Sequence, residues 1–140
     1  MYQHIFRGLM DFLFTFHSHF RWLILLSAVV VVVAYLAGIL GKREFSRVDR
    51  LLGSSFVGLI DVQALLGIIL LGHRIATGLL NHHVAEHAVT MILAVVLAHL
   101  PARWRQAESG VRFRNSLLCY SGGLTLLAVG ILRLRGAFVW

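Results

Sequence analysis

The strongest fold signal in this chain is the stretch HSHFRWLILLSAVVVVVAYLAGILGKR, residues 17–43. It opens with two histidines, continues through an apolar run with five consecutive valines, and closes on a basic Lys-Arg pair. An uninterrupted apolar run of about 20 residues has the length of a helix that crosses the hydrocarbon core of a bilayer. Residues 20–40 are therefore predicted to form a membrane-spanning helix.

Three further apolar runs predict spans over residues 51–72, 84–100 and 115–132. The third is the shortest, because Pro101 lacks a backbone donor and disfavours helix in the residue before it. None of the runs alternates strictly between apolar and polar residues, as strands of a membrane barrel would. The sequence thus predicts an all-α integral membrane protein, a four-helix up-down bundle forming a single domain over residues 1–140.

Composition supports this class. Hydrophobic residues make up 59% of the chain, charged residues 14%, and the mean hydropathy is +0.82. Soluble globular domains carry fewer apolar residues and about a quarter charged residues. A soluble catalytic domain is excluded because the four spans use most of the chain, and no nucleophile-base arrangement or phosphate-binding loop is present.

Residues 1–16 place apolar side chains at helical spacing, with Arg7 and Asp11 between them. This pattern is typical of a short helix that lies in the membrane interface. The alternative is that residues 1–16 simply extend the first span.

Basic residues predict the orientation. Loops 41–50 and 101–114 hold eight lysines and arginines, whereas the opposite side of the membrane holds five. The positive-inside rule places both loops in the cytoplasm and both termini outside. The net charge of +7 comes from arginines at the ends of apolar runs, without the aromatic residues expected of a nucleic-acid surface. Its expected partners are lipid headgroups, not nucleic acid.

Six of the eight histidines fall at the outer end of the predicted bundle, because successive spans run in opposite directions. They are His17, His19, His73, His82, His83 and His87. Imidazoles facing one another across a bundle core are a common way to bind b-type haem. The sequence predicts iron ligation by His17 or His19 together with His87. His73 is a further candidate metal ligand.

Two of these histidines cannot face the core together. His19 is rotated about 200° from His17 on a helix. Arg21 shares a face with His17 and could neutralise a haem propionate or bind a quinone carbonyl or a lipid phosphate. An interfacial belt of polar residues is the alternative interpretation of Arg21. His82 and His83 are expected to be exposed in a loop.

Asp61 and Gln63 are the other polar residues within a span, where a charged carboxylate costs at least a few kcal/mol. Asp61 is predicted not to face lipid. It is a candidate for proton transfer or for a hydrogen bond to quinone, or else it joins helices by bonding Ser27, Thr125 or a partner subunit. Gln63 lies about 200° round the helix from Asp61, so we expect one of them to face this bundle and the other a neighbouring protein.

The motifs His17-Ser18-x-x-Arg21-Trp22 and Glu86-His87 resemble those of small bacterial four-helix membrane proteins that are loosely described as cytochrome-b-like. Asp61 and Gln63, followed by Leu-Leu-Gly, resemble the span between those motifs, so the resemblance covers roughly residues 17–100. It implies a haem or redox setting in the inner membrane of a bacterium.

The leading hypothesis is a membrane subunit of a respiratory or photosynthetic electron-transfer system. It would bind haem b, or contact quinone, near the outer face and associate with other subunits of a membrane complex. The second hypothesis is a cofactor-free accessory subunit that packs around a larger assembly. A small transporter is a third, weakened because no internal repeat or broken helix is evident.

Overall fold

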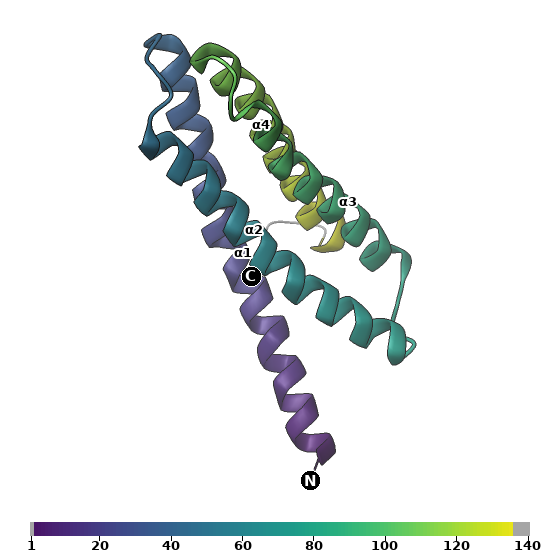
Figure 1. Ribbon diagram of the computed structural model, residues 1–140. Helices are drawn as coiled ribbons and strands as arrows, with labels where there is room; N and C mark the ends of the chain where they lie inside the picture. The colour runs from purple at the N-terminus through teal and green to yellow at the C-terminus, as the bar shows by residue number, and fades with distance from the viewer. Residues whose placement is uncertain (1, 136–140) are drawn as a thin grey trace.

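The computed structural model describes residues 2–135, which form a bundle of four long helices (Figure 1). The elements are α1 (Tyr2–Leu40), α2 (Arg47–Ala76), α3 (His82–His99), the short 3-10 helix η1 (Leu100–Trp104) and α4 (Ser109–Arg135). No strand occurs among the described residues. All four long helices have the length and apolar composition needed to cross a membrane. The predicted all-α, multi-pass membrane fold is confirmed.

The helices follow one another up and down the bundle. α1 packs against α2 and α4, and α3 packs against α4 and α2, whereas the backbones of α1 and α3 do not approach each other closely. The first and third helices are therefore diagonal neighbours, as the sequence predicts. Figure 1 shows α3 and α4 running alongside each other, with α1 and α2 forming the other side of the bundle.

The N-terminal segment is not a separate interfacial helix. Residues 2–40 form one unbroken helix, and no proline interrupts them. At 1.5 Å per residue this helix is about 58 Å long, roughly twice the thickness of the hydrocarbon core. The ring of Phe6 packs edge-on against that of His73, 5.6 Å away, near the end of α2. The alternative, that this segment extends the first span, is confirmed for the described residues 2–16.

Each helix turns one narrow stripe of residues toward the interior. The buried positions recur at spacings of three and four, which is the pattern of helices packed at a shallow angle. The buried core residues are Ile24, Ala28, Val31 and Tyr35 on α1, Phe56 and Ile60 on α2, Ala94 and Ala98 on α3, and Phe113, Tyr120 and Leu127 on α4. The outward faces remain apolar, as expected of a bundle whose surroundings are lipid.

Aromatic rings fill the half of the bundle nearest the two basic loops. Tyr35 lies at the centre of this cluster, with ring centroids of Phe45, Phe113 and Tyr120 between 5.5 and 5.6 Å away. The ring of Phe56 meets that of Tyr120 edge-on at 5.2 Å. This half is therefore densely packed with side chains.

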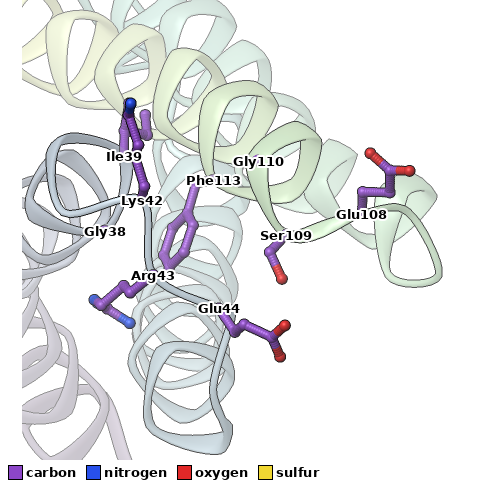
Figure 2. A pocket seen from close by; sticks show the side chains of 9 residues that line it. All are labelled: Gly38, Ile39, Lys42, Arg43, Glu44, Glu108, Ser109, Gly110 and Phe113. Carbon is purple, nitrogen blue, oxygen red and sulfur yellow. The ribbon is translucent and has the colours of Figure 1, made fainter.

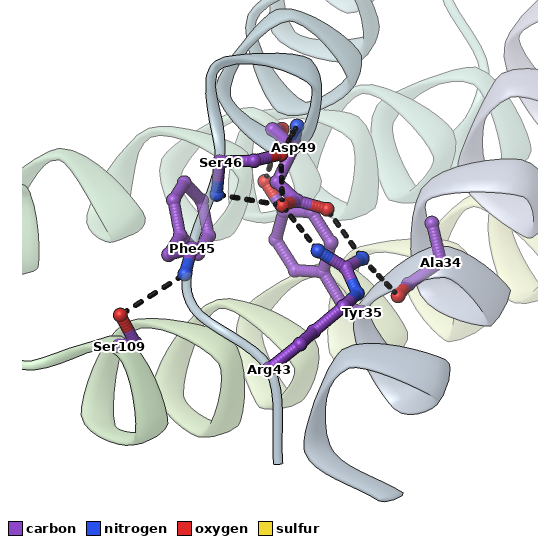
Figure 3. A network of polar contacts seen from close by, with 7 residues as sticks. All are labelled: Ala34, Tyr35, Arg43, Phe45, Ser46, Asp49 and Ser109. Carbon is purple, nitrogen blue, oxygen red and sulfur yellow. Dashed lines mark hydrogen bonds and ion pairs between the residues drawn. The ribbon is translucent and has the colours of Figure 1, made fainter. Parts of the chain in front are cut away.

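Asp49 secures the connection between α1 and α2 (Figure 3). Its carboxylate accepts hydrogen bonds from Arg43 Nη1 at 2.6 Å and Nη2 at 2.7 Å, and from the Ser46 backbone N–H at 2.8 Å. The Tyr35 hydroxyl donates to the backbone oxygen of Asp49 at 2.9 Å. The hydrogen bonds with Asp49 raise the pKa of Arg43 above its ordinary value, which keeps the guanidinium charged. Ser46 and Asp49 also form a capping box that begins α2.

Candidate functional site

α1 turns His17 and Arg21 toward the interior of the bundle. They continue the stripe that carries Ile24 and Ala28, at spacings of four, three and four residues. His17 is half-buried, and the Arg21 side chain is only 9% exposed. An imidazole and a guanidinium thus occupy positions that are apolar further along the same helix.

α2 approaches His17 through a glutamine and a glycine. Gln63 Nε2 donates to the backbone oxygen of His17 at 2.9 Å. A Cβ atom at Gly67 would lie 3.3 Å from His17 Cε1, so the absence of a side chain there makes room for the imidazole. The other amide atom, Gln63 Oε1, is buried and accepts no hydrogen bond from the described residues. Gln63 therefore faces this bundle and offers one buried acceptor.

α3 holds His87 against α4 in a similar way. His87 is half-buried, and its Nδ1 lies 3.0 Å from the backbone oxygen of Gly130. A carbonyl oxygen only accepts, so Nδ1 carries the proton and a neutral His87 has its lone pair on Nε2. A Cβ at Gly130 would clash with Met91 and Thr90 and press on His87 Nδ1. Glycine at this position permits the contact between the imidazole and the α4 backbone.

The two histidine–glycine contacts lie toward the same end of the bundle. Gly38 of α1 packs against Phe113 of α4. Seventeen residues along these antiparallel helices lead to Arg21 on α1 and Gly130 on α4. At equal rise per residue, Arg21 and Gly130 lie at similar depth. We call the inward residues here the histidine end: His17, Arg21, Gln63, Gly67, His87, Thr90 and Gly130.

The remaining predicted ligands point elsewhere. His19 is exposed and its Nδ1 lies 2.8 Å from the backbone oxygen of Thr15, so the prediction that it faces away from His17 is confirmed. His73 packs against Phe6. His82 and His83 are exposed, as predicted, but they form the first turn of α3 instead of a loop. Within residues 2–135 no three metal-ligating side chains gather as a ready-made site.

Asp61 of α2 pairs with His99 at the end of α3. Its Oδ2 lies 3.4 Å from His99 Nε2, and each side chain is 49% exposed. The predicted bonds to Ser27 and Thr125 do not form, because both hydroxyls donate within their own helices. The Asp61 side chain is thus half-exposed in the isolated chain, and its predicted opposition to Gln63 is confirmed.

The basic-loop end has a pocket of about 570 Å³ between the α1–α2 connection and the start of α4 (Figure 2). Lys42 and Arg43 line it together with Glu44 and Glu108. In Figure 2 the Arg43 guanidinium and the Glu44 carboxylate extend in opposite directions. The positive and negative side chains of this pocket balance, and Arg43 is already paired with Asp49. The pocket therefore carries no excess charge that would indicate a binding or catalytic site.

The importance of Asp49 was not recognised from the sequence. It stands in a loop where basic residues outnumber acidic ones, next to Arg47 and Arg50. The available signal was the spacing Ser46-x-x-Asp49, which places a side-chain acceptor three residues after a helix-capping serine.

No protein-family model matches this chain, and neither curated proteins nor solved structures show significant similarity to it. The resemblance to cytochrome-b-like membrane proteins thus stays a prediction from short motifs. Any functional assignment has to be argued from the histidine end itself.

Proposed function

We propose that this chain is a membrane subunit of an electron-transfer system and that its histidine end binds one b-type haem. His17 and His87 would supply the axial ligands, and Arg21 would neutralise a propionate. The single observation that carries the proposal is the bond between His87 Nδ1 and the backbone oxygen of Gly130, 3.0 Å long.

That bond prepares His87 as a ligand. Histidines that bind metals commonly donate their other ring nitrogen to a carbonyl or carboxylate, which sets the tautomer and the direction of the ring. His87 satisfies this requirement through the α4 backbone and keeps Nε2 unprotonated. A bound haem would supply one-electron chemistry, with a potential set partly by its axial ligands and by the surrounding charge.

The sizes of the interior side chains also distinguish the histidine end from the other end of the bundle. Tyr35, Phe113 and Tyr120 fill the interior near the basic loops. At the histidine end Gly67 and Gly130 lie against His17 and His87, so each imidazole packs directly on a helix backbone. The two candidate ligands are therefore held at glycines, whereas aromatic rings fill the interior at the other end.

Charge is the third supporting observation. Arg21 is mostly buried, and a buried guanidinium favours a carboxylate or phosphate acceptor because its donors match two oxygens at once. Buried Gln63 Oε1 is an acceptor for a hydroxyl donor, which suits a quinol that exchanges electrons at this end.

The first experiment is a reduced-minus-oxidised optical spectrum of the protein purified in mild detergent, together with a pyridine haemochrome assay. We expect an α band at about 560 nm and about one haem per chain. His87→Ala should lose this signal while helix content by circular dichroism is retained. His83→Ala removes an exposed imidazole from the same helix and should keep the signal. A colourless wild-type protein with intact helices would refute the haem proposal.

A second candidate function is that of a cofactor-free accessory subunit, and one specific observation favours it. The Asp61–His99 pair is half-exposed within the spans, whereas most exposed side chains there are apolar. A polar pair at such a position is costly against lipid and calls for a polar partner. Asp61→Leu should then abolish co-purification with partner subunits without changing haem content. Retained association would argue against this second function.

A further inference from the structure

A second groove, of about 460 Å³, runs between α2, the α3–η1 junction and the first three turns of α4. Three arginines line it, Arg50 from α2, Arg105 from the segment after η1 and Arg112 from α4. The only acidic residue among its described lining is Asp61, which is paired with His99. The groove lies at the basic-loop end of the bundle, away from the histidine end.

The positive charge of this groove is not balanced within the described residues. None of its three arginines forms an ion pair with a described acidic side chain. The guanidinium of Arg112 lies 3.8 Å from the ring centre of Phe45, and the charge of Arg50 acts unfavourably on it. Nearby Asp49 already holds Arg43. Because like charges on one groove repel, an anion bound between them would be stabilising.

The groove also reaches from the polar end of α2 into its apolar part. Asp61 follows Arg50 by eleven residues, which is about 16 Å along a helix. Between these two positions the wall includes Gly53, Val57 and Gly58, and the facing wall includes Ala98. A molecule that fits has an anionic head at the arginines and an apolar portion beside small side chains.

We propose that this groove binds an anionic phospholipid, with the lipid phosphate held by Arg50, Arg105 and Arg112. Guanidinium groups match phosphate oxygens in geometry and charge, and basic pockets between spanning helices are established sites for such headgroups. This proposal is independent of the haem, because it concerns other residues at the opposite end of the bundle.

The test uses the full chain, delipidated in detergent and titrated with phosphatidylglycerol or phosphatidylcholine, with bound lipid counted by mass spectrometry of the intact protein. We expect phosphatidylglycerol to bind at least about tenfold more tightly. In the variant R50Q/R105Q the affinity for phosphatidylglycerol should fall by about 25-fold, because each arginine contributes about fivefold. The control R47Q/R103Q removes the same charge from neighbouring exposed positions outside the groove. We expect its affinity for phosphatidylglycerol to change by less than about twofold.

Three results would overturn the proposal. Equal binding of the two lipids would show that the phosphate charge is not recognised. Equal weakening in the two double variants would assign the effect to diffuse charge. Displacement of the lipid by millimolar inorganic phosphate would make the groove a site for free phosphate. R50K/R105K, which keeps the charge, should retain most of the binding, so loss in R50Q/R105Q is not attributable to misfolding.

Discussion

Arg43 and Asp49 join the end of α1 to the start of α2 through two hydrogen bonds, 2.6 and 2.7 Å long. The Arg43 side chain is partly exposed, whereas the Asp49 side chain is only 2% exposed. The same carboxylate caps α2 through Ser46, and the backbone oxygen of Asp49 accepts from the buried Tyr35 hydroxyl. One acidic residue thus connects the basic loop and the first turn of α2 through its side chain, and the aromatic core through its backbone oxygen.

Removal of this carboxylate should destabilise the bundle. Asp49→Ala deletes the acceptor of the capping box and of both bonds from Arg43, so we expect a loss of about 1–3 kcal/mol in unfolding free energy. Asp11→Ala, in an exposed position on α1, should change stability by less than about 0.5 kcal/mol. Unfolding monitored by circular dichroism in detergent measures both, and equal stability of the two variants would contradict the role assigned to Asp49.

A methyl group at Gly130 should disturb the histidine end. In Gly130→Ala the new Cβ meets Thr90, Met91 and His87, and such overpacking costs about 1–3 kcal/mol. In Gly72→Ala the new Cβ meets nothing within 4 Å, so the variant should gain about 0.5–1 kcal/mol from the lower entropy of the unfolded chain. If α3 packs on α4 as described, thermal unfolding should show a lower midpoint for Gly130→Ala and a higher midpoint for Gly72→Ala, each relative to wild type.

The two histidines of the His17-Ser18-His19 motif should behave differently. His17 faces the interior beside Gly67, whereas His19 is exposed and bonds within its own helix. If the histidine end binds haem, His17→Gln should abolish most of the reduced-minus-oxidised signal, and His19→Gln should leave it within about twofold of wild type. Loss of the signal in both variants, or only in His19→Gln, would remove His17 from the ligand pair.

The predicted orientation can be tested with single cysteines. Lys42→Cys and Thr77→Cys lie in connections at opposite ends of α2. In a Cys119→Ser background, a membrane-impermeant maleimide applied to intact cells should label position 77 and spare position 42, because the basic loops are predicted to be cytoplasmic. The reverse pattern would place the two termini in the cytoplasm.

Much of the fold was predictable because span length and apolar content are local properties. The spans predicted at 20–40, 51–72, 84–100 and 115–132 all lie within the observed helices. The N-terminal helix was not predicted correctly, because interfacial and continuous helices share the same amphipathic spacing over residues 1–16. Only the absence of a break, visible in the structure, distinguishes them.

The candidate site was predictable in part. Helical geometry alone separates His17 from His19 and Asp61 from Gln63, since residues two apart point in nearly opposite directions. It gives no information about which helix each residue meets. The pairing of Asp61 with His99 depends on the axial register of α3 relative to α2. The sequence of either helix alone does not specify this register.

By itself, therefore, the sequence determined four apolar helices, their antiparallel order and the residues that share a helix face. Each of these follows from local periodicity and from the cost of exposing backbone polar groups to lipid. The tertiary structure alone decided that His17 packs on Gly67, that His87 bonds the carbonyl of Gly130, and that Arg50, Arg105 and Arg112 line one groove. These relationships depend on the rotation and axial register of helices distant in the chain, which are set when all four inward stripes pack together.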